Sequence, residues 1–312
     1  PVQATSHGHP VPSGIPTVDY YISWGAAELE YETAKSHYSE ELILLNSNVP
    51  HQYYTPRHSK LKGGQSMMDG GFFQELSNRS YFRKYMTPKK EGSDIFHDDN
   101  HTTVRWYTCM QKPHKFMPEM DPLLCDVLQA DPQGILILHQ PDNPNILQSL
   151  EQRLQIAHCD MDRVYFVPVL PHHELLALYS VSTLILDSYP AGGCTTTREV
   201  LELQKLVVTW PARLLGGRWS YAYYQILGDE LLNQHVIATS HDDYVQKAAR
   251  LGQDASLRTT LEFRIGLSLP NLYMRQGAVR SWEEVLLKIS PVEKRDTCDA
   301  AENDGGGGAS TV

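Results

Sequence analysis

The sequence predicts an α/β fold built on a doubly wound parallel sheet, and two features carry this prediction. From residue 103 onward, short aliphatic and β-branched runs alternate with segments of helical periodicity. Such alternation is typical of parallel strands joined by helical crossovers that cover both faces of a sheet. In addition, three of the strands lead into loops rich in Gly, Thr or Lys. Loops of this kind lie at the carboxyl edge of a parallel sheet, where ligands bind.

Length and composition limit the classes of protein that this chain can represent. Its 312 residues are 41% hydrophobic and 21% charged, which is typical of a globular chain of about two domains. The formal net charge of −10 argues against a general nucleic-acid-binding protein. No apolar stretch approaches the roughly eighteen residues of a membrane span. Because the chain begins at Pro1 and not at Met, we expect it to be a piece of a longer protein.

Residues 1–60 are predicted to be the last part of an N-terminal Rossmann-like domain. A loop with His7, His9 and Pro10 precedes a strand at 18–23, a helix at 26–41 and a strand at 42–45. The two histidines and the proline can face a cleft and contact substrate, or they can serve only the loop itself. Residues 61–102 lack periodicity and are predicted to be a linker or insertion.

Residues 103–290 are predicted to form one Rossmann-like domain, followed by a disordered tail at 291–312 that contains four successive glycines. The expected strands are 103–109, 134–139, 163–167, 183–186 and 206–209. The expected helices are 121–129, 145–156, 172–179, 195 onward and 218–226, and three further helices at 241–251, 257–266 and 282–289 are expected to close the domain.

The segment 184–202 combines a buried strand, a turn with Gly192 and Gly193, and a helix that begins near Thr195. The first turn of a helix offers free N–H groups and a positive dipole end to an anion. Thr195 and Thr196 add hydroxyl donors, and Glu199 can accept hydrogen bonds from ribose hydroxyls. This segment therefore predicts a phosphate site, although an ordinary turn with a threonine cap would have the same composition.

Two other loops are expected at the same edge of the sheet. Gln111 and Lys115 follow the strand at 103–109, where a lysine can neutralise phosphate, although an exposed surface charge is the simpler alternative. Gly217 and Arg218 begin the helix after the strand at 206–209. His172 begins another helix and can line a base pocket or merely cap that helix.

The five cysteines are dispersed and contain no CxxC pair, so they predict reduced thiols in the cytoplasm or nucleus and no zinc site. Asp160 and Asp162 have the spacing of a metal-binding pair. They precede a strand, however, and are predicted to form a turn at the opposite edge of the sheet. No metal site and no cofactor are expected.

Short segments spread over both domains form a combination more specific than its parts. They are PVQA at 1–4, GHP at 8–10 with SG at 13–14 and DY at 19–20, YSE at 38–40, Gln111 with Lys115 and DP at 121–122, RV at 163–164 with Pro168, Asp187 with Gly193 and TT at 195–196, and VVTWP at 207–211 with GR at 217–218. This combination resembles the C-terminal catalytic region of the O-GlcNAc transferase family. That family includes the Spindly-type protein fucosyltransferases and bacterial cytoplasmic glycosyltransferases of the adhesin type. The similarity covers about residues 1–60 and 103–285.

The resemblance implies a two-domain glycosyltransferase of the GT-B type that needs no metal and holds a UDP-sugar mainly in its C-terminal domain. By similarity, Lys115 is the catalytic residue that contacts the donor diphosphate, Thr195 and Thr196 hold phosphate oxygens, and Glu199 stands at the ribose position. The remaining donor-binding candidates are Gln111, Leu170, His172, Gly193, Cys194 and Arg218.

The chain also departs from the family at several positions. Cys194 stands where the family often has His or Gly, Leu175 where animal members have a base-stacking His, and His172 where they have a Lys. By the same resemblance, the proposed base histidines lie before Pro1, and this chain alone is expected to bind the donor poorly or to be inactive.

The predicted function is transfer of GlcNAc from UDP-GlcNAc to Ser or Thr hydroxyls of proteins by an inverting displacement. The expected partners are a nucleotide sugar and protein acceptors, without nucleic acid. Three alternatives stay open: an asparagine glucosyltransferase, a GDP-fucose protein O-fucosyltransferase, and a non-catalytic nucleotide-sugar-binding module.

Overall fold

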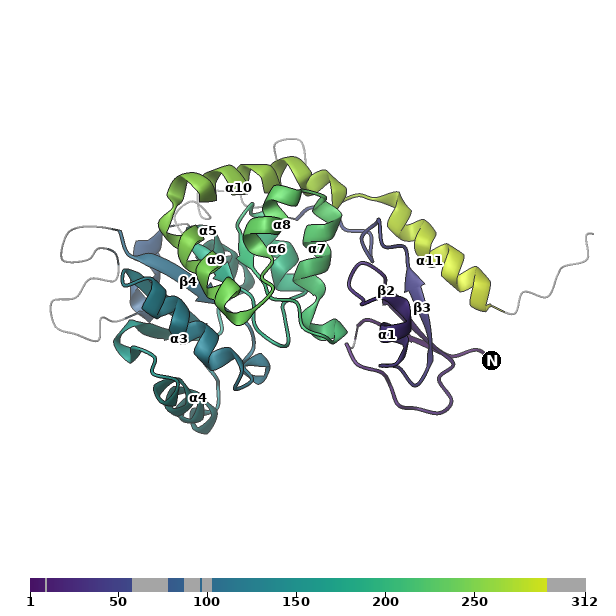
Figure 1. Ribbon diagram of the computed structural model, residues 1–312, viewed down its shortest axis with the longest axis horizontal. Coiled ribbons are helices and arrows are strands. Elements are labelled where there is room, and N and C mark those ends of the chain that lie inside the picture. The colour runs from purple at the N-terminus through teal and green to yellow at the C-terminus, as the bar shows by residue number, and fades with distance from the viewer. Residues whose placement is uncertain (9, 58–77, 87–95, 97–102, 291–312) are drawn as a thin grey trace, which may run out of the picture.

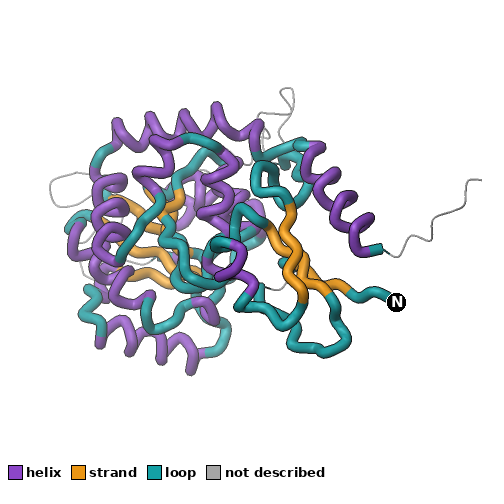
Figure 2. The backbone as a smooth tube through the Cα atoms, turned by 45° about the vertical axis from the view of Figure 1, so that its right-hand side comes forward, coloured by secondary structure: helices purple, strands orange, loops and turns teal. Residues whose placement is uncertain are grey.

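The computed structural model describes residues 1–8, 10–57, 78–86, 96 and 103–290. The chain forms two lobes joined side by side, and each lobe is built around its own parallel sheet (Figure 1; Figure 2). In the smaller lobe, β1 (Ala4–Ser6), β2 (Tyr20–Trp24) and β3 (Glu41–Leu45) pair in the order β1-β2-β3. The predicted α/β fold with two parallel sheets is thus confirmed.

The larger lobe contains a five-stranded parallel sheet in the order β6-β5-β4-β7-β8. Its strands are β4 (Arg105–Cys109), β5 (Gly134–His139), β6 (Val164–Val167), β7 (Leu184–Leu186) and β8 (Val207–Val208). The crossover helices are α3 (Met120–Ala130), α4 (Pro144–Ile156), α5 (His172–Val181), α6 (Thr195–Glu202) and α7 (Trp219–Leu227). Each predicted strand and helix of this sheet is present within a few residues of its expected bounds.

Further helices complete the chain beyond the sheet. They are α8 (Glu230–Val236), α9 (His241–Gln253), α10 (Ala255–Ser268) and α11 (Gln276–Ile289). Short 3₁₀ turns occur at Arg79–Tyr85, Pro113–Lys115, Met161–Arg163, Leu215–Gly217 and Leu269–Asn271. Helix α8 was not expected. Asp229 is its N-cap residue, and the Asp229 side chain accepts a hydrogen bond from the Leu232 N–H at 3.1 Å.

The helix expected at 26–41 is much shorter in the structure, because α1 spans only Tyr31–Lys35. The side chain of Glu28 accepts hydrogen bonds from the hydroxyls of Ser23 and Tyr38, which holds the chain before α1 in a turn. Side-chain hydrogen bonds of this kind compete with helix formation.

Helix α11 was expected to close the second domain, yet it lies against β3 of the smaller sheet (Figure 1). The Ser281 hydroxyl accepts a hydrogen bond from the Asn46 N–H at 2.8 Å, and the Trp282 indole donates to the His51 carbonyl at 2.7 Å. The C-terminal helix therefore ties the two lobes together. The boundary predicted at residue 290 stays a prediction.

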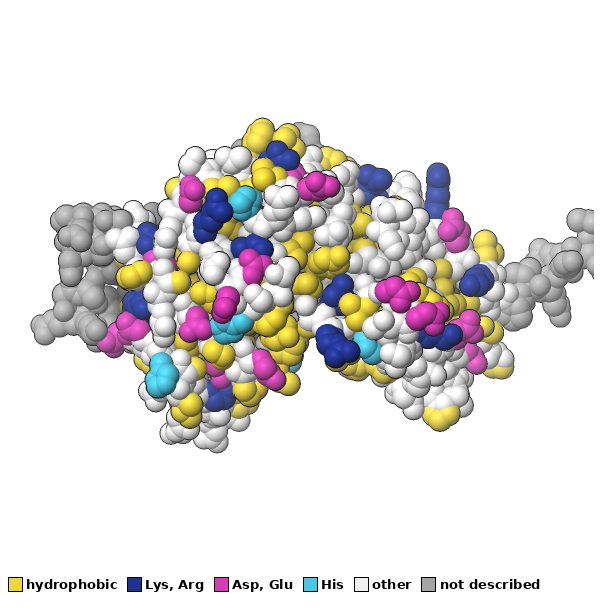
Figure 3. Space-filling view, in the orientation of Figure 1, with side chains coloured by type: hydrophobic (Ala, Val, Ile, Leu, Met, Phe, Trp, Pro, Cys, Tyr) yellow, Lys and Arg dark blue, Asp and Glu magenta, His cyan; other side chains and the backbone are white. Residues whose placement is uncertain are grey.

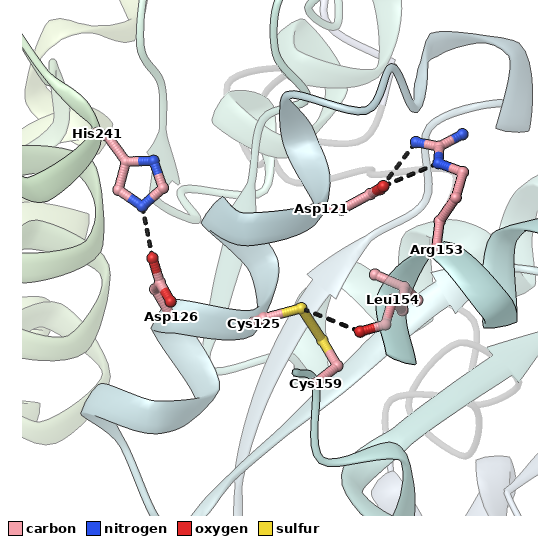
Figure 4. The surroundings of a disulfide bond; sticks show 7 residues. All are labelled: Asp121, Cys125, Asp126, Arg153, Leu154, Cys159 and His241. Carbon is pink, nitrogen blue, oxygen red and sulfur yellow. Dashed lines mark hydrogen bonds and ion pairs between the residues drawn. A yellow bond between two sulfur atoms is a disulfide. The ribbon is translucent and has the colours of Figure 1, made fainter. Parts of the chain in front are cut away.

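The prediction that all cysteines are reduced is wrong for one pair. Cys125 on α3 and Cys159 after α4 form a disulfide (Figure 4). Cys109 and Cys194 are free, and Cys298 lies outside the described residues. The sequence did not indicate this pair because 34 residues separate the two cysteines and only the packing of α4 on α3 brings them together.

Candidate functional site

A cavity of about 620 Å³ lies between the two lobes, at the carboxyl edge of the larger sheet. The space-filling view shows a notch between the lobes with Lys or Arg side chains at its margin (Figure 3). The smaller lobe contributes His7, Gly8, Pro10, His51, Gln52 and Tyr54 to the cavity. The larger lobe contributes His114, Lys115, Ala191, Gly192, Cys194, Thr195, Arg198, Gly216, Trp219 and Tyr223.

The turn after β7 is held in place by a buried carboxylate. Asp187 accepts hydrogen bonds from the Gly193 N–H at 2.7 Å and from the Thr209 hydroxyl at 2.8 Å. Burial raises the pKa of Asp187, which these donors partly offset. A Cβ atom at Gly193 would lie 2.6 Å from both Gln111 Nε2 and Thr197 Oγ1. The turn therefore needs glycine at this position for steric reasons.

Lys115 and Gln111 are connected to this turn by a chain of hydrogen bonds. The Lys115 ammonium donates to the Gly192 carbonyl at 2.7 Å and to Gln111 Oε1 at 3.0 Å. Gln111 Nε2 in turn donates to the Thr196 hydroxyl at 2.8 Å. The structure thus brings together residues that the sequence placed on two separate loops. The lysine charge lies beside the first turn of α6, where the helix dipole also favours an anion.

The start of α6 is not capped by a side chain. Cys194 occupies the N-cap position and makes no capping hydrogen bond, and its thiol lies 3.4 Å from the Tyr223 hydroxyl. Thr195 follows it and lines the cavity. An uncapped helix start leaves N–H groups of the first turn available to an acceptor such as a phosphate oxygen.

Several predicted donor-binding residues do not line the cavity: Gln111, Gly193 and Thr196, which belong to the turn and its hydrogen bonds described above, and Glu199, His172 and Leu170. Glu199 is buried on α6 and pairs with His172, whose Nε2 lies 3.0 Å from Glu199 Oε1. Leu170 is buried among hydrophobic core residues. The roles of Glu199, His172 and Leu170 in binding the base and ribose remain predictions.

Arg218 is also separated from the cavity, because its guanidinium points toward the smaller lobe. Its Nε donates to the Ala27 carbonyl at 2.6 Å, and a terminal nitrogen donates to the Ala212 carbonyl at 3.1 Å. In the structure this arginine joins the lobes.

His7 contributes a buried imidazole to the cavity. Its ring makes an edge contact with His51, with centroids 4.5 Å apart. Burial lowers the pKa of His7 to about 4. The pKa of His51 lies well below its usual value, mainly because of burial and also because of the charges of His7 and Arg198. Both rings are therefore neutral near pH 7. The Nδ1 atom of His7 is buried and has no hydrogen-bond partner among the described residues.

Of the other two cleft candidates, His9 lies outside the described residues, whereas Pro10 lines the cavity. Pro10 also lines an adjoining, more apolar cavity of about 610 Å³. His51, Tyr54, Arg198, Trp219 and Tyr223 were missed by the sequence reasoning. No local motif marks them, because only the apposition of the two lobes places them together.

Within the described part of the chain, no group of three or more His, Cys, Asp or Glu side chains is placed to hold a metal ion. The same residues include no helix that is long and apolar enough to cross a membrane.

Comparison with known proteins supports the family resemblance. No protein-family profile matches the chain. It is 24% identical over 272 residues to a tomato (Solanum lycopersicum) protein described as a probable UDP-N-acetylglucosamine–peptide N-acetylglucosaminyltransferase SPINDLY. An Arabidopsis thaliana protein of the same description is 24% identical over 276 residues. The chain is therefore similar in sequence to SPINDLY proteins over most of its length. Each match covers 85% of this chain and 25% of the relative, so the chain spans about a quarter of their length.

Solved structures show the same fold. A variant of the Thermobaculum terrenum O-GlcNAc transferase aligns with a TM-score of 0.68 at 20% identity, over 93% of this chain and 48% of that one. Anabaena HepE in complex with UDP and glucose aligns with a TM-score of 0.51 at 12% identity, over 87% of this chain and 63% of that one. The chain therefore has the GT-B fold of these glycosyltransferases, as the resemblance implied.

Proposed function

We propose that the protein to which this chain belongs transfers GlcNAc from UDP-GlcNAc to Ser or Thr hydroxyls of proteins. One observation carries the proposal: Lys115 and the uncapped start of α6 at Cys194 and Thr195 line the cavity between the lobes, and hydrogen bonds through Gln111 and Thr196 connect them. This arrangement suits a diphosphate, since it combines an ammonium charge, hydroxyl donors and free N–H groups. The names of the SPINDLY and O-GlcNAc transferase relatives support UDP-GlcNAc as the donor.

In the proposed complex, the donor diphosphate lies against Lys115, Gly193, Cys194, Thr195 and Thr196. The nucleoside extends toward Glu199, His172 and Leu170. The sugar faces the smaller lobe, where the unsatisfied His7 Nδ1 can accept a hydrogen bond from a sugar or acceptor hydroxyl. The acceptor polypeptide enters near Pro10, which borders both cavities.

The proposed reaction is a single inverting displacement that requires no metal. The acceptor oxygen forms a bond to the anomeric carbon while the bond from that carbon to the β-phosphate oxygen breaks, and the acceptor proton passes to the departing diphosphate. The electron pair stays on the departing UDP. Lys115 and the start of α6 stabilise the charge that grows on the leaving phosphate, which lowers the barrier more than uniform substrate binding would.

Calorimetric titration of UDP and then GDP tests the proposal. We expect UDP to bind more tightly than GDP. We expect Lys115→Ala to weaken UDP binding about 10- to 100-fold, since a hydrogen bond from a charged group is worth about 1.5–3 kcal/mol. The exposed Lys35 on α1 provides the matched control, and Lys35→Ala should bind UDP as the wild type does. Binding of neither nucleotide, or a preference for GDP, would contradict the assignment of UDP as the donor nucleotide.

The sugar and the acceptor require a second measurement. Labelled GlcNAc should appear on Ser or Thr of a protein substrate with inversion at the anomeric carbon, in the presence of a chelator. We also propose a cytoplasmic or nuclear location, which fractionation of the parent protein tests. The Cys125–Cys159 disulfide counts against this location, because disulfides are rare in those compartments. The oxidation state of this cysteine pair should therefore be measured in the same fractions.

A further inference from the structure

Arg198 is a buried cation that lines the cavity between the lobes. Only 7% of the residue is exposed, and its guanidinium lies over the Tyr54 ring, 4.4 Å from the centroid. Tyr273 and the neighbouring carboxylate of Glu199 also interact with it electrostatically. Burial raises the pKa of both phenols, so neither carries a negative charge at neutral pH. Among the described residues, no ion pair joins Arg198 to a carboxylate.

Three other arginines show how this chain accommodates a guanidinium that is withdrawn from water. Arg105 forms an ion pair with Asp131, and Arg153 forms one with Asp121. Arg79, for which the described residues supply no carboxylate partner, donates to three oxygens: the carbonyls of Val104 and Val181 and the hydroxyl of Thr183. A charge withdrawn from water is costly unless it is paired or fully hydrogen-bonded. Arg198 is therefore a buried guanidinium that lines the cavity and has no ion pair with a carboxylate among the described residues, so that a ligand in the cavity would supply an anion.

The position of Arg198 indicates which anion this is. It lies one turn after Thr195 on α6, and both residues line the cavity together with Lys115. Burial raises the pKa of the Cys194 thiol, whereas the charges of Lys115 and Arg198 both act to lower it. The two cations therefore act on the same point, the N-cap of α6. An anion bound at the start of this helix would lie within the field of both.

We propose that Arg198 is the second cation of the diphosphate site and that its guanidinium binds the β-phosphate of a nucleoside diphosphate. The inference rests on the proposed function, because it takes the ligand to be a nucleotide-sugar donor. A planar guanidinium can hold two phosphate oxygens at once, which an ammonium cannot. Two cations beside the diphosphate also stabilise the charge that develops on the β-phosphate as the sugar leaves.

The test compares ligands that differ in the second phosphate. UDP, UMP and inorganic pyrophosphate are titrated calorimetrically into the wild-type chain and its Arg198→Met and Arg198→Lys variants. We expect Arg198→Met to weaken UDP and pyrophosphate about 10- to 100-fold, as for the loss of one charge-assisted contact, and to leave UMP affinity nearly unchanged. Arg198→Lys should be intermediate. The exposed Arg250 on α9 is the matched control, and Arg250→Met should behave as wild type.

The possible outcomes separate this inference from the proposed function. If Arg198→Met weakens UMP and UDP equally, Arg198 acts through packing and the inference is wrong. If UDP binds every variant alike, the inference fails while the donor assignment stands. If the wild-type chain binds pyrophosphate but not UDP, the anion site stands and the proposed donor is wrong. If it binds neither ligand, both the anion site and the proposed donor are wrong. Should Arg198→Met not fold, the UDP-to-UMP ratio of Arg198→Lys decides in the same way.

Discussion

The disulfide between Cys125 and Cys159 predicts a large and specific effect of reductant on stability. The bond joins α3 to the segment after α4 and closes a loop across a sequence separation of 34 residues. The entropy that such a link removes from the unfolded chain corresponds to about 3.8 kcal/mol at 25 °C. Measured values commonly fall below this figure because of strain and residual structure, so we expect a loss of about 2–4 kcal/mol on reduction.

Urea denaturation with and without dithiothreitol measures this loss, and Cys159→Ser supplies the control. The variant should match the reduced wild type in its transition midpoint and should not respond to reductant, because its remaining partner Cys125 cannot form the bond. Far-UV circular dichroism and intrinsic fluorescence should be followed together, since a chain with two lobes can unfold in more than one step. A native wild-type chain in which both thiols react with a thiol reagent, and whose midpoint ignores reductant, would refute the cross-link.

Three further predictions concern the site and the contact between the lobes. Gly193→Ala places a Cβ atom 2.6 Å from Gln111 Nε2. We expect this clash to lower the free energy of unfolding by about 1–3 kcal/mol, measured by thermal melting, and to weaken UDP binding, measured by calorimetry. Wild-type melting and unaltered UDP affinity would count against the steric argument. Arg218→Met removes the donors to the Ala27 and Ala212 carbonyls; amide exchange should rise where the lobes meet, and unchanged exchange would contradict this role. For His7, the unfolded chain gains a proton below about pH 6.5 and the folded chain only near pH 4, so stability should fall by about 3 kcal/mol between these values. His7→Leu should lack this component of the pH profile, and parallel wild-type and variant profiles would disprove it.

The turn after β7 and the helix start that follows it could be expected from the sequence because they depend on local pattern. A buried strand, two glycines and threonines at a helix start specify a turn whose N–H groups face an anion, whatever packs around it. Lys115 and Gln111 could be included because parallel strands place their following loops at one edge of the sheet. The structure adds the contacts that connect these loops, such as the bond from Gln111 to Thr196.

The rest of the cavity could not be expected in this way. His51 and Tyr54 follow β3, and Arg198, Trp219 and Tyr223 lie on α6 and α7. Their assembly depends on how one lobe is set against the other, which no periodicity encodes. The same holds for α11, whose helical pattern was evident while its packing partner in the smaller sheet was not.

The sequence by itself therefore determined the strands, most of the helices, the parallel arrangement and the glycine turn that leads into α6. These features follow from hydrophobic periodicity and from turn and helix-terminus chemistry, which act over a few residues. Tertiary structure alone decided the disulfide, the position of Arg218 between the lobes and the burial of Arg198 without a carboxylate. Each of these features depends on contacts between residues far apart in the chain. Those contacts contribute to stability only after the lobes and helices have packed together.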